Sequence, residues 1–186
     1  MPLKLNLGCG ERRLPGYINV DKYGAPDLRH DLESFPWPWE KNSVGEIRLV
    51  HALEHMGRTA DIFCGIICEL YRICVPDAMV HIVVPHPRHD DFITDPTHVR
   101  PLTAESFEMF SKAKNREWIS QGYANTPLGL YLDVDFETVD VRYTLDAIWL
   151  SKEDRAQLTG KALYHTSMKH NNVIKEITVI LKAIKP

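Results

Sequence analysis

The sequence has few cysteines, no long apolar run and no excess of positive charge. Four cysteines stand among 186 residues, and no two of them form a C-x-x-C pair, so the common zinc-ribbon and thioredoxin spacings are absent. A transmembrane helix needs about 18 consecutive apolar residues, and no such stretch occurs. The first residues also lack the apolar core of a signal peptide. We therefore expect reduced thiols, no membrane segment and a cytoplasmic protein.

The charge balance is close to neutral. Lys and Arg number 22 against 25 Asp and Glu, which gives a net charge of −3 with His neutral. A protein dedicated to nucleic acid or an anionic membrane normally has a basic excess, so this balance disfavours both partners. Hydrophobic residues make up 44% of the chain, which is enough for a packed core. The length predicts a single domain over residues 1–186.

Apolar patterning predicts an α/β fold with a mostly parallel, doubly wound sheet and an antiparallel edge. Residues 59–74 carry an apolar stripe at helical spacing, and Thr103 is the expected N-cap of a second helix, with Ser106 at the capping-box position. Residues 151–172 are typical of a helical insertion between the last two strands. We expect strands at residues 3–7, 17–21, 27–31, 44–50, 79–84, 139–145 and 173–184.

The first strand ends in the glycine turn Gly8-Cys9-Gly10, and the second ends at Asp21, 11 residues after Gly10. Glycines let a ligand approach the backbone closely, and a carboxylate at the next strand end can accept both hydroxyls of a ribose. A dinucleotide site would need a third glycine and a helix N-terminus for its phosphates. Only residues 11–16 separate the turn from the second strand, and they include Pro15. The pattern therefore favours S-adenosylmethionine, and a dinucleotide-dependent oxidoreductase is the weaker alternative.

Together these segments resemble class I S-adenosylmethionine-dependent methyltransferases, and most closely the short "predicted methyltransferase" subgroup with L-P-G-(Y/W)-x-N-V-D behind the glycine turn. The motifs are Leu5-Asn6-Leu7-Gly8-Cys9-Gly10, Asn19-Val20-Asp21, His30-Asp31-Leu32 and His51-Ala52-Leu53-Glu54-His55-Met56.

The resemblance implies a seven-stranded, Rossmann-like sheet whose last strand is antiparallel. It also implies that the glycine turn holds the methionine end of the cofactor, that Asp21 holds the ribose and that Asp31-Leu32 meets the adenine. The His51 segment would lie beside the methionine moiety. The cofactor-binding residues expected on this basis are Gly8, Cys9, Gly10, Asp21, Lys22, Asp31, Leu32, His51 and His55.

Three features depart from the family pattern. Asn6 stands where many members have Asp, the first helix is truncated, and an insertion separates the last two strands. The truncation leaves one side of the cofactor open or covered by another subunit, so oligomerisation is compatible with the sequence. These departures also keep a second interpretation open, a non-catalytic methyltransferase-like module for binding or assembly.

The loop over residues 85–98 holds the densest group of titratable side chains, and it leaves a strand at the edge where an acceptor would bind. We expect His98 and His86 to be candidate bases, because His titrates near neutral pH, with Asp95 as an orienting carboxylate. The alternative is that these residues only anchor the loop. The predicted reaction is methyl transfer to an oxygen or nitrogen of a small molecule or sugar.

Two patterns suggest a metal, and we predict a site from neither. Residues 51–55 match H-x-x-E-H, a zinc-peptidase motif that requires a helix, whereas here the motif directly follows a strand. His89, Asp90, Asp91 and Asp95 could bind a divalent cation, but exposed acidic loops are common without one.

Overall fold

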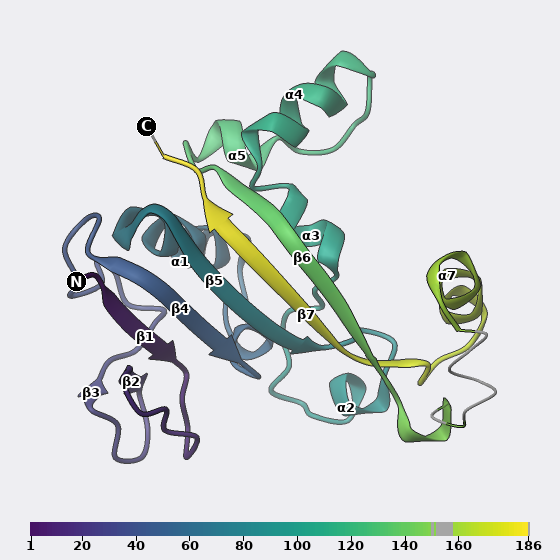
Figure 1. Ribbon diagram of the computed structural model, residues 1–186, viewed down its shortest axis with the longest axis horizontal. Coiled ribbons are helices and arrows are strands. Elements are labelled where there is room, and N and C mark those ends of the chain that lie inside the picture. The colour runs from purple at the N-terminus through teal and green to yellow at the C-terminus, as the bar shows by residue number, and fades with distance from the viewer. Residues whose placement is uncertain (150, 152–157, 186) are drawn as a thin grey trace.

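The computed structural model describes residues 1–149, 151 and 158–185. Within these residues, seven strands form one sheet in the order β3-β2-β1-β4-β5-β7-β6 (Figure 1). The strands are β1 Leu3–Leu7, β2 Ile18–Asp21, β3 Leu28–Arg29, β4 Val44–Val50, β5 Cys74–Pro85, β6 Phe136–Leu145 and β7 Ile174–Ala183.

Strands β1 to β5 are parallel to one another, and β7 pairs antiparallel with both β5 and β6. The predicted fold class is therefore confirmed, and the antiparallel strand lies one place in from the edge that β6 forms. Leu7 is aligned with Val20 on one side and with Leu49 on the other, so β1, β2 and β4 end at the same edge of the sheet. Ligands bind at this edge in open α/β sheets.

The helices and 3₁₀ turns lie between the strands along the chain. They are α1 Ala60–Ile73, α2 Asp90–Ile93, α3 Ala104–Glu108, α4 Lys112–Ser120, α5 Leu128–Tyr131 and α7 Gly160–Lys169, with 3₁₀ turns at Leu53–His55 and Ala147–Trp149. Helix α7 lies in the stretch 151–172 that the sequence marks as a helical insertion. Residues 152–157 of that stretch lie outside the described residues.

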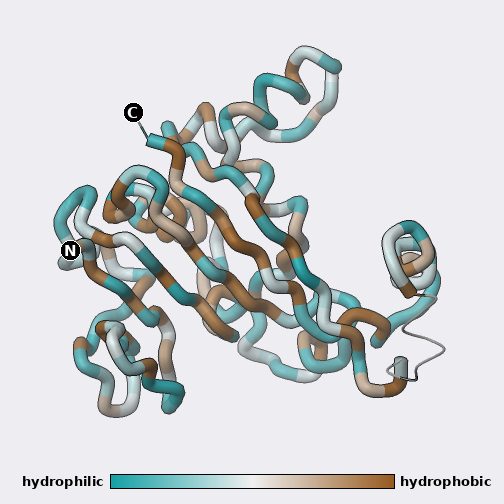
Figure 2. The backbone as a smooth tube through the Cα atoms, in the orientation of Figure 1, coloured by the Kyte–Doolittle hydropathy of each residue, from teal (hydrophilic) through white to brown (hydrophobic). Residues whose placement is uncertain are grey.

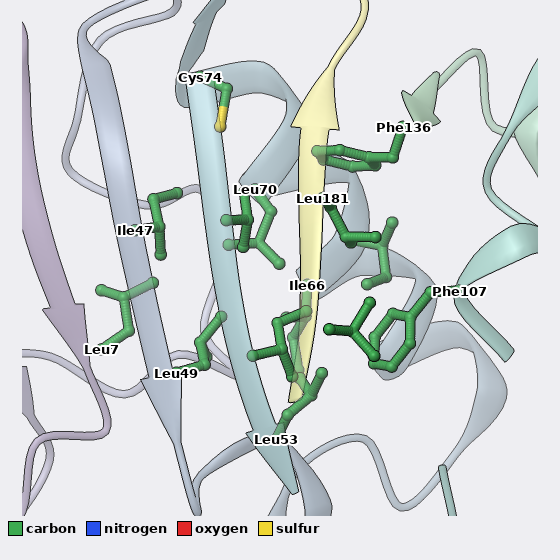
Figure 3. Packing of buried hydrophobic residues seen from close by; sticks show 14 of the residues in the cluster. Leu7, Ile47, Leu49, Leu53, Ile66, Leu70, Cys74, Phe107, Phe136 and Leu181 are labelled. Atoms are coloured by element: carbon green, nitrogen blue, oxygen red, sulfur yellow. The ribbon is translucent and has the colours of Figure 1, made fainter. Parts of the chain in front are cut away.

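The core forms where α1 and α3 pack on one face of the sheet (Figure 1). Thr59 caps α1 by accepting a hydrogen bond from the Ile62 N–H at 3.4 Å, and the helix buries its apolar stripe, including Ile66 and Leu70. Phe107 of α3 and Leu181 of β7 meet this cluster, as Figure 3 shows. Hydrophobic residues are concentrated along the central strands (Figure 2).

The opposite face of the sheet is half-buried. Residues of β4, β5 and β7 alternate between buried and partly exposed positions, which is typical of a sheet with one covered face. Glu46, Arg48 and Tyr17 form a hydrogen-bonded network on this partly exposed side. In the part of the chain that the structure describes, no helix combines the length and apolarity that a membrane span requires.

A tryptophan-containing loop fixes the region after β3 against α1. Trp37 and Trp39 are 3% and 8% exposed, and the Trp37 indole N–H donates to the Leu32 carbonyl at 3.0 Å. The Trp37 backbone N–H donates to Glu69 Oε2 at 2.6 Å, and Glu69 also pairs with Arg72 at 2.7 Å. The loop therefore holds Leu32 in position through buried contacts.

Candidate functional site

A cavity of about 420 Å³ opens at the edge where β1, β2 and β4 end. Pockets of this size accommodate a cofactor or a drug-sized ligand. Its walls come from five separate segments of the sequence. The lining residues are Gly8, Asp21, Lys22, Tyr23, His30, Asp31, Leu32, Glu33, His51, Ala52, His55, Met56 and Thr97.

Of the glycine turn, Gly8 lines this cavity, whereas Cys9 and Gly10, also predicted to bind the cofactor, are not among its lining residues. Gly8 has φ +66°, and a Cβ built there would lie 2.5 Å from the Ala52 Cβ, so a larger residue cannot fit without movement. Gly10 has φ +48°, and a Cβ there would meet no atom within 4 Å, which leaves its backbone open to a ligand. Between them, Cys9 is 5% exposed and donates its N–H to the Val20 carbonyl at 3.1 Å, and burial raises the pKa of its thiol.

Buried amides support the turn from below. The Asn6 side-chain amide donates to the Arg12 carbonyl at 2.8 Å and to Asn19 Oδ1 at 2.9 Å. Asn19 also accepts the Leu14 N–H at 2.7 Å and donates to Asp27 Oδ2 at 2.7 Å. These bonds shape the connection from β1 to β2, which is a turn where many α/β folds have a crossover helix. A turn held by the Asn6 and Asn19 side chains thus takes the place of the first helix, which the sequence predicted to be truncated.

Asp21 lies beside the turn. Its Oδ2 accepts the Gly10 N–H at 2.8 Å and its Oδ1 accepts the Tyr23 N–H at 2.9 Å. A carboxylate has about four acceptor positions, so each oxygen retains capacity for a further donor. The backbone therefore fixes the carboxylate at the cavity wall while leaving it able to bind hydroxyl groups.

The region after β3 forms the far wall. Lys22 Nζ lies 3.8 Å from Asp31 Oδ2, which brings two of the predicted residues together. Glu33 Oε1 accepts the Gly57 N–H at 2.7 Å and so ties this wall to the segment after β4. Leu32 is 4% exposed and provides an apolar surface at this end of the cavity.

His51 ends β4 with an unusual backbone. Its φ of +53° is rare for a residue other than glycine, and such strain concentrates at functional sites. Its Nδ1 lies 3.5 Å from Glu54 Oε1 and its Nε2 lies 3.0 Å from Glu176 Oε1. The nearby Glu54 carboxylate, aided by the charge of Glu176, raises the pKa of His51 despite its burial.

The three predicted catalytic side chains do not share one cavity. His98 contacts His55 and not the cavity itself: the two ring centroids are 4.5 Å apart. Asp95 Oδ2 lies 3.7 Å from His98 Nε2, and Asp95 Oδ1 accepts hydrogen bonds from Thr97. Asp95 and His98 therefore lie together at the rim.

His86 lies on a different cavity, of about 270 Å³, beneath α7. Thr103, Tyr143 and Tyr164 line this second cavity with it. Burial lowers the pKa of His86. The sequence named His98 and His86 of one loop as candidate bases, but His86 lines this second cavity and His98 does not.

Several lining residues were not among the site residues predicted from the sequence, although His30, Ala52 and Met56 stand within the quoted motifs. Most are chain neighbours of predicted residues, so a search of the positions flanking each strand end would have found them. Glu54 is not among the lining residues: it is 1% exposed, and only the fold brings it beside His98. The lining residues that the sequence did not predict are Tyr23, His30, Glu33, Ala52, Met56 and Thr97.

Neither a protein-family model nor a curated protein sequence matches this chain. Among solved structures, it is similar to an S-adenosylmethionine-dependent methyltransferase from Archaeoglobus fulgidus, with a TM-score of 0.56 and 16% identity over 97% of this chain and 86% of that one. A second such methyltransferase, from Methanosarcina mazei, gives a TM-score of 0.54 and 12% identity over 98% and 92% of the two chains.

A third similar structure is a 16S rRNA (adenine(1408)-N(1))-methyltransferase from Catenulisporales acidiphilia, crystallised with S-adenosylmethionine as cosubstrate. It gives a TM-score of 0.50 and 16% identity over 100% of this chain and 87% of that one. At these identities the likeness concerns the fold. The chain therefore has the fold found in S-adenosylmethionine-dependent methyltransferases of known structure.

Proposed function

We propose that this protein is a methyltransferase that uses S-adenosylmethionine. The observation that carries the proposal is that Gly8 of the glycine turn and the Asp21 carboxylate line the same cavity, with Asp21 fixed by the Gly10 N–H. The fold similarity to methyltransferases supports the same conclusion. The residues fit the cofactor because a nucleoside needs an acceptor for its hydroxyls and close backbone approach, and the wall offers both.

In this proposal, different walls of the cavity bind different parts of the cofactor. Asp21 accepts hydrogen bonds from the ribose hydroxyls, Leu32 and Asp31 contact the adenine, and Gly8 and Gly10 allow the amino-acid end to approach the backbone. Lys22, near Asp31, lies at the adenine end. The cofactor supplies an electrophilic methyl group when it is bound.

His51 and His55 lie at the other end of the cavity, where an acceptor would enter. The two carboxylates beside His51 orient its imidazole and favour its protonated form. A protonated imidazole can donate a hydrogen bond to an acceptor molecule and so position it near the cofactor. We propose a small molecule or sugar with a hydroxyl or amino acceptor. The absence of a basic excess supports this class over a nucleic acid.

A dinucleotide fits the same edge less well. The phosphates of a dinucleotide bind at a helix N-terminus after the glycine turn. Residues 11–17 form turns held by Asn6 and Asn19, with no helix among them. This observation argues against the oxidoreductase alternative.

Isothermal titration calorimetry with S-adenosylhomocysteine tests the proposal. We expect one molecule bound per chain and no heat from NAD at the same concentration. Absence of binding at millimolar S-adenosylhomocysteine would overturn the proposal. Where binding is found, formation of S-adenosylhomocysteine from S-adenosylmethionine in the presence of hydroxylated small molecules separates an enzyme from a non-catalytic binding module.

A further inference from the structure

We propose that Glu54, His55 and His98 bind one divalent transition-metal ion at the rim of the cavity. One nitrogen or oxygen atom from each of the three side chains lies within 4.8 Å of the other two. A metal held at about 2.1 Å from each ligand keeps ligand atoms within about 4.2 Å of one another, so a contraction of roughly half an ångström would complete the site.

The backbone already holds the two ligand-bearing segments together. Glu54 and His55 lie in the 3₁₀ turn after β4, whereas His98 belongs to the loop after β5. The Glu54 carbonyl accepts the N–H groups of Val99 and Arg100 at 2.9 and 3.1 Å. These two bonds fix His98 next to the turn independently of any ion, so the arrangement is built in advance.

Glu54 is the observation that points to a ligand. Its side chain is 1% exposed, and neither carboxylate oxygen has a hydrogen-bond partner among the described residues. His51 Nδ1, at 3.5 Å from Oε1, is too distant for a good hydrogen bond and leaves Oε2 without a partner. Burying a carboxylate in this way costs several kcal/mol unless it is paired or binds a metal.

The two histidines are prepared to donate the same nitrogen. His98 Nδ1 lies 2.9 Å from the Phe92 carbonyl, which can only accept, so this nitrogen carries the proton and Nε2 is left with its lone pair. His55 Nδ1 is engaged with Thr97 Oγ1 at 2.9 Å, which likewise leaves Nε2. Metal-binding histidines usually have their other nitrogen fixed by such an outer partner.

This set differs from the peptidase motif that the sequence contains. His51 of H-x-x-E-H faces Glu54 and Glu176, so the two histidines of the motif do not converge, and His98 takes the third place instead. Two imidazoles and one carboxylate suit Zn²⁺, Fe²⁺ or Mn²⁺ and leave positions open for another ligand.

The metal site borders the proposed acceptor end of the cavity, because His55 and its hydrogen-bond partner Thr97 both line the cavity. A bound ion would coordinate a hydroxyl group and make its proton more acidic, so that the proton passes to solvent before the oxygen reacts. This role rests on the proposed function, and it narrows the acceptor to a compound with a hydroxyl group. The binding of the ion itself does not depend on the proposed function.

Zinc binding to the chelator-treated protein tests the inference directly. Competition with a chromophoric chelator gives the stoichiometry and affinity for Zn²⁺, and the Co²⁺ form gives an absorption spectrum that reports the ligands. We expect one ion per chain. The variants Glu54→Gln, His55→Ala and His98→Ala should each weaken Zn²⁺ binding at least tenfold, whereas His165→Ala, which removes an exposed histidine of α7, should not.

His55 is exposed, so its variant keeps the test valid even where the buried Glu54 variant fails to fold. The proposal is overturned by a wild-type protein that binds no Zn²⁺ at about ten micromolar, or by variants that all bind Zn²⁺ as tightly as the wild type. Calorimetry with S-adenosylhomocysteine on the metal-free protein separates the two proposals. Cofactor binding without zinc binding overturns only the metal site, and zinc binding without cofactor binding overturns only the proposed function.

Discussion

The backbone N–H of Gly10 donates to Asp21 Oδ2 at 2.8 Å and so joins the turn after β1 to the end of β2. This bond connects two features that the sequence places 11 residues apart. It exists because β1 and β2 are parallel neighbours whose ends lie at one edge of the sheet. A carboxylate held in this way loses little rotamer freedom on binding a ligand, which favours affinity.

Replacing Asp21 with Ala should weaken S-adenosylhomocysteine binding. The loss of an acceptor for two hydroxyls corresponds to about 1–3 kcal/mol, or roughly a 5- to 150-fold higher Kd. Calorimetry measures the change. The control is Glu117→Ala, which removes a carboxylate from an exposed ion pair on α4 and should leave the Kd unchanged. Equal affinities for the Asp21 variant and the wild type would remove Asp21 from the cofactor site.

Comparing Gly10→Ala with Gly122→Ala separates the effect of backbone strain on stability from the effect of a new methyl group on ligand binding. Gly10 and Gly122 both have positive φ, and a Cβ at either position would meet nothing within 4 Å. Each alanine substitution should therefore lower the free energy of unfolding by about 1–2 kcal/mol. Only Gly10→Ala should also weaken S-adenosylhomocysteine binding, because its methyl group would occupy the space that the ligand needs. Urea unfolding and calorimetry on both variants give the comparison, and matched Kd values would contradict it.

Strand positions were predictable where the chain marks its own boundaries. The expected strands at 3–7 and 44–50 match β1 and β4, because a glycine turn ends the first and an Asn-Ser turn precedes the second. Strand β5 begins earlier than expected, at Cys74, since Val44 pairs with it across a bulge. That pairing is tertiary, and residues 74–78 contain Pro76, which conceals it. Helix α4 was missed because it buries only Asn115 and has no apolar stripe.

In the candidate site too, features marked by the local sequence were predictable and features set by tertiary contacts were not. Residues at strand ends, such as Asp21 and His51, were identifiable because parallel strands bring their ends together. His86 and His98 lie 12 residues apart in one loop, and only the path of that loop shows that His86 lines the second cavity while His98 packs on His55 at the rim of the first. The proximity of Glu54 to His98 was equally hidden, because it rests on tertiary hydrogen bonds from Val99 and Arg100 to the Glu54 carbonyl.

Asn6→Asp should destabilise the protein. The Asn6 amide nitrogen donates to two acceptors, the Arg12 carbonyl and Asn19 Oδ1. A carboxylate has no proton to donate, so the variant would bury a negative charge against two oxygens. We expect the free energy of unfolding to fall by about 2–4 kcal/mol.

Urea unfolding of Asn6→Asp near pH 7 measures this change. Asn42→Asp is the control, because Asn42 lies in an exposed turn and uses its side-chain oxygen rather than its nitrogen to accept from Lys185. Equal stability of the Asn6 variant and the wild type would show that the Asn19 amide turns over to donate in its place.

Glu46→Gln should change how stability depends on pH. Burial raises the pKa of Glu46, but hydrogen bonds from Tyr17, Lys4 and Arg48 outweigh it and lower the pKa from 4.5 to about 2. The Lys4 ammonium lies 2.9 Å from Oε2 and Arg48 Nη2 lies 3.2 Å from Oε1. A carboxyl group with a lowered folded-state pKa stabilises the protein fully above its unfolded value and loses that stabilisation as the pH falls.

The stabilisation by Glu46 is therefore complete above about pH 5 and declines between pH 4.5 and about 2. Its upper limit is about 3 kcal/mol, from 1.36 kcal/mol for each pKa unit. Urea unfolding from about pH 7 to pH 3 should show Glu46→Gln to be less stable at neutral pH and progressively closer to the wild type below pH 4.5. Glu117→Gln, in an exposed ion pair, should run parallel to the wild type throughout. A constant difference between Glu46→Gln and the wild type across this range would show that folding does not lower the pKa of Glu46.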